Sequence, residues 1–221
     1  MTRAIPRGLA TALVAAAASA ACSQTTGHPA VAGASHDHSA MTMAAPAPAS
    51  GGAAANAGDV AFVSGMIPHH AQAVIMAGWA PTHGARADVA ILCERIVVGQ
   101  RDEIKMMQTW LADRGLPVPD ATSTRMKMRM DGMEHEMLMP GMLTDEEMAA
   151  LDRARGPEFD RLFLVGMIRH HQGAIDMVDE LMKAPGAAQD EKVFRFSADV
   201  FADQSTEIAV MQKMLESGRL D

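Results

Sequence analysis

Cysteine, aromatic residues and positive charge are all scarce in this sequence. Its 221 residues include two cysteines, Cys22 and Cys93, with six Phe, two Trp and no Tyr. Two cysteines cannot supply the disulfide framework of a small secreted domain, and Cys93 is expected to be a buried structural residue. The 19 Lys and Arg are outnumbered by 27 Asp and Glu, which gives a formal charge of −8. Without a basic cluster, such an acidic chain is a poor partner for nucleic acid.

The first 58 residues do not have the composition of a folded domain. Residues 1–21 carry Arg3 and Arg7 before an Ala-rich apolar run, which predicts a secretory signal peptide rather than a membrane span. Residues 19–22 resemble a bacterial lipobox, so export yields either a lipoprotein anchored through Cys22 or a plainly secreted protein. Residues 22–58 are rich in Ala, Gly, Pro, Ser and Thr, and predict a flexible tether. We therefore expect an exported protein of the periplasm or outer cell envelope, in contact with membrane only through that lipid.

Residues 59–220 are expected to form one all-α domain. Apolar residues recur there at helical spacing, and we find no pattern that predicts a strand. Residues 116–156 are a long Met-rich connector, in which Thr144 and Glu147 make a capping box for a short helix. The long helices are expected at 59–80, 89–111, 157–183 and 189–216.

The two halves of this domain repeat the same motif. Met-Ile-x-His-His occupies residues 66–70 and again 167–171, and one more Met follows each copy at the same distance. The second helix of each half repeats Gln-x2-Glu-Ile-x2-Met-Gln, at 100–108 and 204–212. Duplicated hairpins of this kind most simply close into a four-helix bundle with pseudo-twofold symmetry. Pro68 lies inside the first copy, so that helix is either kinked or tolerates the lost hydrogen bond, at a cost of roughly 3 kcal/mol.

The repeated histidines and methionines have the composition of a soft-metal site. On a helix each His pair straddles the preceding Met, so that every imidazole lies about one turn from a thioether. Thioether sulfur is soft and neutral, so it suits Cu(I), with Ag(I) as a mimic, and is a poor ligand for Mg, Ca or Mn. Zinc sites use Cys, His and carboxylate, and di-iron bundles need Glu-x-x-His, which this sequence lacks. The candidate metal ligands are His69, His70, Met66, Met76, His170, His171, Met167 and Met177.

Several roles stay open at this point. Inward Met residues often serve packing alone, and buried imidazoles need partners, for which Glu103 and Glu207 are candidates. Asp59 and Asp160 are expected to cap helices or to orient the imidazoles. The Met-rich stretch at 126–142 is either a strap that covers the bundle or a second, more labile soft-metal site. The His pairs could form one shared site or two.

These motifs resemble the signature of the domain-of-unknown-function 305 family. The similar segments are residues 158–177 and, for the first copy, 65–76, and the likeness extends over about 59–220. The resemblance implies a ferritin-like four-helix bundle that is typically exported, and some relatives are implicated in copper binding and copper resistance. Most members have no assigned activity. By position, all eight candidate ligands match the motif of this family.

The sequence therefore predicts an exported copper-binding protein and no enzyme. It would bind Cu(I) through His and Met in copper buffering, transfer or resistance, with copper ions and another envelope copper protein as partners. One alternative is a metal-dependent oxidoreductase on a ferritin-like scaffold, against which the missing Glu-x-x-His motif counts. Another is a structural envelope protein with a Met-filled core. Nothing in the sequence resembles a hydrolytic triad, a phosphate-binding loop or a nucleophilic cysteine site.

Overall fold

The structure, a computed structural model, describes residues 55–130 and 132–217. The expected signal peptide (1–21) and the expected tether (22–58) up to residue 54 lie outside the described residues. The first helix begins at residue 57, just inside the range expected for the tether. The helices are α1 (Ala57–Gly78), α2 (Ala80–His83), α3 (Ala87–Ala112), α4 (Asp145–Arg153), α5 (Pro157–Lys183) and α6 (Glu191–Ser217).

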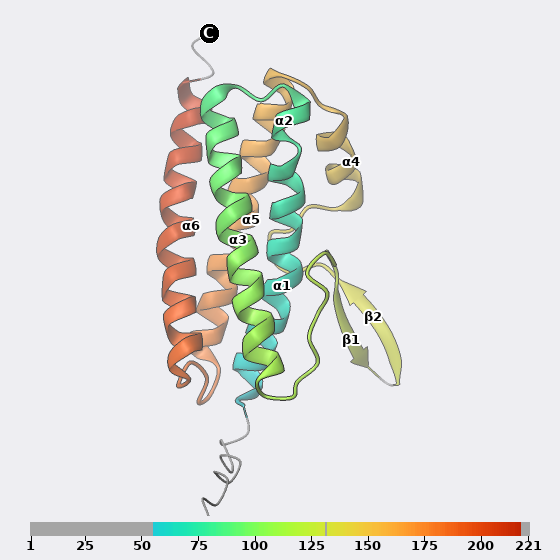
Figure 1. The fold of residues 1–221 in the computed structure, drawn as a ribbon, viewed down its shortest axis with the longest axis vertical. Coiled ribbons are helices and arrows are strands. Elements are labelled where there is room, and N and C mark those ends of the chain that lie inside the picture. Colours follow the sequence, from blue (N-terminus) through green and yellow to red (C-terminus); the bar gives the residue numbers. More distant parts are fainter. Residues whose placement is uncertain (1–54, 131, 218–221) are drawn as a thin grey trace, which may run out of the picture. The chain divides into compact units, whose positions relative to one another are not determined.

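Four long helices form a bundle of two hairpins, as the repeat predicts (Figure 1). Helix α1 packs along α3, α5 packs along α6, and the two hairpins meet where α1 lies against α5. The short α2 belongs to the turn between α1 and α3, and α4 lies beside α1 and α5. The helical fold class expected from the sequence is confirmed.

Local sequence explains where three of these helices begin. The side chain of Asn56 accepts a hydrogen bond from the Gly58 N–H at 2.7 Å and so caps α1. At α4 the expected capping box is confirmed, because the side chain of Thr144 binds the Glu147 N–H and the Glu147 carboxylate binds the Thr144 N–H. Helix α5 starts at Pro157, whose missing N–H costs nothing in a first turn.

Helix α1 continues through Pro68, which lies in its middle. The helix therefore tolerates the loss of one backbone hydrogen bond and does not end at the proline. The segment Ala57–His83 is also long and apolar enough to cross a membrane by length and composition alone. However, 78% of its apolar window is buried inside the bundle, as in the core helix of a globular domain.

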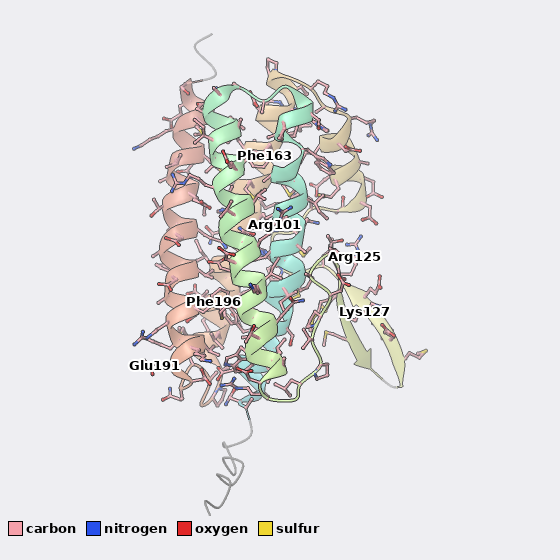
Figure 2. The ribbon with its side chains drawn as sticks, viewed as in Figure 1. Arg101, Arg125, Lys127, Phe163, Glu191 and Phe196 are labelled. Carbon is pink, nitrogen blue, oxygen red and sulfur yellow. The ribbon has the colours of Figure 1, made fainter. Side chains whose placement is uncertain are left out.

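The hydrophobic core has two parts, and each takes residues from all four long helices. Phe163 belongs to one part and Phe196 to the other, and Figure 2 shows these two residues at different heights of the bundle. Along each helix, the stretch between the two parts carries buried polar residues instead. The apolar core is thus divided by a polar layer.

The connector contains a β-hairpin, so the expectation of no strand was wrong. Strands β1 (Met126–Met130) and β2 (Met133–Met137) pair antiparallel beside the bundle (Figure 1). Two signals were present in the sequence: Met alternates with other residues at the period of a strand, and Asp-Gly at 131–132 is a favoured hairpin turn. Methionine is not among the residues enriched in strands, so this alternation is a weak strand signal.

After the hairpin, residues 138–143 form a strap across α1 and α5. Gln72 of α1 holds the strap at Leu143, because its Nε2 donates to the Leu143 carbonyl (2.9 Å) and its Oε1 accepts from the Leu143 N–H (2.7 Å). On α5, Gly173 lies so close to Pro140 that a Cβ there would collide with the Pro140 carbonyl. Of the two roles expected for the Met-rich stretch at 126–142, that of a strap covering the bundle applies to its last residues, 138–142.

Asp59 and Asp160 hold the turns of the opposite hairpins, and neither caps its own helix or contacts an imidazole. The Asp59 carboxylate accepts a hydrogen bond from the Ala188 N–H (2.6 Å), in the turn between α5 and α6. The Asp160 carboxylate accepts from the Arg86 N–H (3.3 Å), at the start of α3. The expected roles were wrong because each aspartate finds its partner in the other half of the domain.

We predict that Gly173→Ala destabilises the domain, because the added methyl group would push the backbone of the strap away from α5. Such overpacking costs about 1–3 kcal/mol. The control is Gly99→Ala, at an exposed position inside α3 where a Cβ meets nothing within 4 Å. That change should stabilise α3 by about 0.5–1 kcal/mol. Urea unfolding of both variants tests the prediction, and equal stabilisation by the two would refute the close contact.

Candidate metal centre

The polar layer crosses the bundle between the two parts of the core. Its centre is formed by the two His-His pairs of α1 and α5, and all four imidazole side chains are 0% exposed. Each pair is accompanied by a Gln and a Glu from the partner helix of its own hairpin. The layer consists of His69, His70, Gln100, Glu103, His170, His171, Gln204 and Glu207.

The inner rings are His69 and His170, one from each hairpin. Their centroids are 3.8 Å apart, with 38° between the ring planes. His170 Nε2 donates to the backbone carbonyl of His69 (3.0 Å), and His69 Nε2 donates to the carbonyl of Pro140 in the strap (3.1 Å). A carbonyl oxygen can only accept, so each of these rings carries its proton on Nε2.

The outer rings are His70 and His171, and each binds a carboxylate. His70 Nε2 lies 2.6 Å from Glu103 Oε2, and His171 Nε2 lies 2.7 Å from Glu207 Oε2. The expectation that these two glutamates orient the imidazoles is confirmed. Their side chains are 26% and 20% exposed, so each carboxylate links a buried ring to the surface of the bundle.

In all four rings Nε2 is hydrogen-bonded, whereas Nδ1 has no hydrogen-bond partner among the described residues. With the proton held on Nε2, a neutral ring presents a bare lone pair at Nδ1. The buried His83 differs, because its Nε2 lies 2.8 Å from the Asp152 carbonyl and its Nδ1 lies 2.9 Å from the Thr82 hydroxyl. Both nitrogens of that histidine are occupied, as in a purely structural residue.

The inner rings are neutral at pH 7. Burial, followed by the nearby His70, lowers the pKa of His69 well below its usual value of 6.5. Burial, followed by the nearby His69, lowers the pKa of His170 in the same direction. Protons therefore do not compete for these two Nδ1 lone pairs in the physiological range.

Gln100 and Gln204 also belong to the layer, although the sequence analysis gave them no role. Both are buried, and their Oε1 atoms make no hydrogen bond within the described part of the chain. Each stands one helical turn before the glutamate that binds an outer ring. Their occurrence at equivalent places in the repeat was the signal that could have identified them.

The outer ring of His70 lies near the side of the bundle where α3 and α6 face one another. A cavity of about 690 Å³ lies between these helices, and its lining includes Glu103 and Phe196. The buried ring of His70 contacts Glu103, and its centroid lies 6.3 Å from that of the Phe196 ring. Burial, together with the nearby Glu103 and Glu207, raises the pKa of Asp203 on the same side. The cavity lining carries both signs of charge, with the carboxylates of Asp102, Glu103 and Asp199 beside the basic side chains of Lys105, Lys192 and Arg195.

The four methionines of the motif lie on either side of the polar layer. Met66 and Met177 belong to one part of the core, and Met76 and Met167 to the other. Each part therefore combines one methionine of α1 with one of α5, which shows that the two helices run antiparallel across the layer. All four are almost completely buried, so packing accounts for their positions whether or not they also bind a metal.

Cys93 is a buried residue of the core, as expected from the sequence. Burial, with a further contribution from Asp160, raises the pKa of its thiol to about 12. Only a thiolate is a good metal ligand, so this side chain is not prepared to bind an ion.

The arrangement offers neutral nitrogen donors with neutral sulfur donors above and below them. Within residues 55–130 and 132–217, no three side chains of His, Cys, Asp or Glu are grouped closely enough to enclose an ion. The layer therefore does not have the ligand cage of a hard or zinc-like metal. Histidines that bind metals almost always donate their other N–H to a carboxylate or a carbonyl, and all four rings do so here.

Comparison with known proteins identifies the chain by family. Residues 59–215 match the family model described as domain of unknown function DUF305. A comparison with curated protein sequences gave no match. Among solved structures, a DUF305 fragment from Deinococcus radiodurans is 27% identical with a TM-score of 0.60, over 74% of this chain and 98% of its own.

Two further solved structures carry more specific descriptions. A DUF305 protein from Streptomyces coelicolor, thought to be secreted, is 27% identical with a TM-score of 0.61, over 73% of this chain and 93% of its own. CopM in its Cu(I)-bound form is 28% identical with a TM-score of 0.54, over 72% of this chain and 96% of its own. CopM structures in Cu(II)-bound, Ag-bound and apo forms are similar to this chain as well.

We predict that the metal-free domain loses stability as the pH falls below about 6.5. The unfolded chain then takes up protons on His69 and His170, whereas the folded state, with its lowered pKa values, does not. The stability linked to these rings is complete above that pH and is lost below it. Each ring steepens the decline by up to about 1.4 kcal/mol per pH unit.

Urea unfolding between about pH 7.5 and 5.5 measures this dependence. The comparison is the double variant His69→Gln with His170→Gln, which keeps an amide donor near Nε2 but cannot titrate. Its stability should fall less steeply with pH than that of the wild type. Identical slopes would mean that these two rings are protonated equally in the folded and unfolded states.

Proposed function

The chain belongs to the DUF305 family, and on that basis we propose that it is an exported copper-binding protein that takes up Cu(I) in the polar layer. It would buffer copper in the cell envelope, transfer it or confer resistance to it. Imidazole nitrogen supplies one kind of donor and thioether sulfur the other. The proposed ligands are His69, His70, His170 and His171, together with Met66, Met76, Met167 and Met177.

The observation that carries this proposal is the set of four buried Nδ1 atoms without hydrogen-bond partners among the described residues. A buried polar atom left unpaired costs about 1–3 kcal/mol, so four in one layer need an explanation. Metal ions that accept these lone pairs, one shared or more than one, with thioethers completing the ligand sets, would be such an explanation. Cu(I) is favoured over harder ions because the flanking side chains are thioethers.

Similar proteins support both the metal and the compartment. CopM is described in Cu(I)-, Cu(II)- and Ag-bound forms, which supports copper for this chain and Ag(I) as its mimic. The Streptomyces coelicolor relative is thought to be secreted, in agreement with the signal peptide expected at residues 1–21. We propose export to the periplasm or outer envelope, either with a lipid on Cys22 or without one.

The proposed function is binding and release without catalysis. Neutral thioether and imidazole ligands take up Cu(I) without losing protons, and they can exchange one at a time. The carboxylates of Glu103 and Glu207 stand between the surface and the outer rings, on the route that an arriving ion would take. Such an arrangement suits a carrier that passes copper to another envelope protein.

An anaerobic Cu(I) titration against a chromophoric chelator tests the proposal. The variant His70→Gln with His171→Gln keeps a donor for each glutamate but removes two imidazole lone pairs. We expect the wild type to compete with the chelator and this variant to lose most of that affinity. If the wild type does not compete, or if the variant binds as tightly, the polar layer is not a copper site.

Two further variants make the titration specific. His83→Gln removes an equally buried imidazole whose nitrogens are both occupied, so Cu(I) affinity should not change. Glu103→Gln with Glu207→Gln leaves the rings but replaces the carboxylates that orient them. Loss of such orienting partners typically lowers metal affinity by about 10–100-fold, and we expect an effect in that range.

A further inference from the structure

The β-hairpin beside the bundle presents a face made of methionine and histidine. In its register Met126 stands opposite Met137, and Met128 stands opposite His135. Because alternate residues of a strand point to the same side, these four residues share one face, which Met133 extends toward the turn. Among the described residues of the hairpin, this face contains no branched aliphatic side chain and no Phe, Trp or Tyr.

Most of this face is open to solvent, whereas Met126 is half-buried. Every residue of β2 is exposed, and the side chains of Met128, Met133 and Met137 are 40%, 62% and 46% exposed. A core role is excluded for them, because core residues are buried. A two-stranded hairpin alone is marginally stable in water, so an exposed row of thioethers there needs another reason.

The opposite face of the hairpin carries ion pairs between the two strands, which favour their observed register. Lys127 Nζ lies 3.1 Å from Glu134 Oε1 and 3.9 Å from Glu136 Oε1. Figure 2 shows Lys127 on the hairpin at the side of the bundle. These charged side chains pair with one another on the face opposite to the Met/His face.

From this arrangement we propose that the Met/His face is a second soft-metal site, accessible from solvent and separate from the polar layer. Side chains opposite one another in an antiparallel pair have Cβ atoms about 4.5–5.5 Å apart, and the two cross-strand pairs are neighbours on the face. Flexible Met side chains can converge on one ion from that spacing. The donors are Met126, Met128, His135 and Met137.

Three thioethers and one imidazole select a soft monovalent ion, Cu(I) or Ag(I), over zinc, magnesium or calcium. The site lies close along the chain to the polar layer, because β2 continues through Leu138 and Met139 to Pro140, whose carbonyl binds His69. A metal ion bound on the hairpin would therefore be held only three residues from a contact of the inner rings. If the proposed function of the polar layer holds, the exposed site would receive the ion and the buried layer would retain it. The hairpin site itself binds the same kind of metal but uses no residue of the polar layer.

Titration of the mature chain with Ag(I) in chloride-free buffer tests the inference, with the bound equivalents measured by calorimetry. The hairpin variant carries Met126→Leu, Met128→Leu, His135→Gln and Met137→Leu, which keep the side-chain volumes but remove the donors. We expect it to bind one equivalent less than the wild type, with an unchanged helical circular dichroism signal. An unchanged number of equivalents and unchanged affinities would overturn the proposal.

Two controls separate this site from the polar layer. Lys127→Gln with Glu136→Gln alters the same two strands on the other face and should leave the bound equivalents unchanged. His70→Gln with His171→Gln should leave the hairpin equivalent in place. If only the hairpin variant loses silver, the hairpin site stands and the polar layer fails as a metal site. If only the histidine variant loses silver, the reverse holds.

Discussion

Burying an imidazole costs free energy unless its nitrogens find partners, and this bundle buries four of them in one layer. The rest of the domain is arranged to supply one partner to each ring. Two rings take a carboxylate from the second helix of their own hairpin, and two take a backbone carbonyl. Every partner goes to Nε2, so the second nitrogen of each ring is available for a partner that the described residues 55–130 and 132–217 do not provide.

The duplicated sequence explains the symmetry of this layer. One position at which the two repeats differ explains why the surroundings of the layer are not symmetric. Gln72 and Gly173 stand at equivalent positions of the two repeats. The glutamine side chain forms two hydrogen bonds with the backbone of Leu143 in the strap, and the glycine leaves room for Pro140 to approach α5. The strap therefore covers one side of the layer and supplies a carbonyl to His69, whereas His170 uses a carbonyl of α1. The inner rings are equivalent in chemistry but not in surroundings.

Much of this could be predicted from the sequence, because it depends on periodicity and repetition. The hairpins, the capping box at Thr144 and the pairing of Glu103 and Glu207 with imidazoles all follow from residues that recur at helical spacing. The contacts that were not predicted join segments far apart in the chain. Asp59 binds the turn near Ala188, and nothing local to either residue indicates this.

The β-hairpin was missed for a different reason. Its period-two alternation and its turn were visible in the sequence, but strands whose uncharged positions are mostly methionine are unusual by ordinary strand preferences. Gln100 and Gln204 were visible in the repeat too, yet a buried amide has no distinctive spacing of its own. Residues that are unusual for their structural setting are expected at sites where they serve function rather than stability.

The central claim is that the four imidazoles keep their protons on Nε2 and offer Nδ1 to copper. Nuclear magnetic resonance of ¹⁵N-labelled side chains, recorded before and after anaerobic addition of Cu(I), measures both nitrogens of each ring directly. The account predicts four Nε2-protonated rings in the metal-free protein and a change at Nδ1 when Cu(I) binds. Protonated Nδ1 atoms in the metal-free protein, or Nδ1 signals unaffected by bound Cu(I), would contradict it.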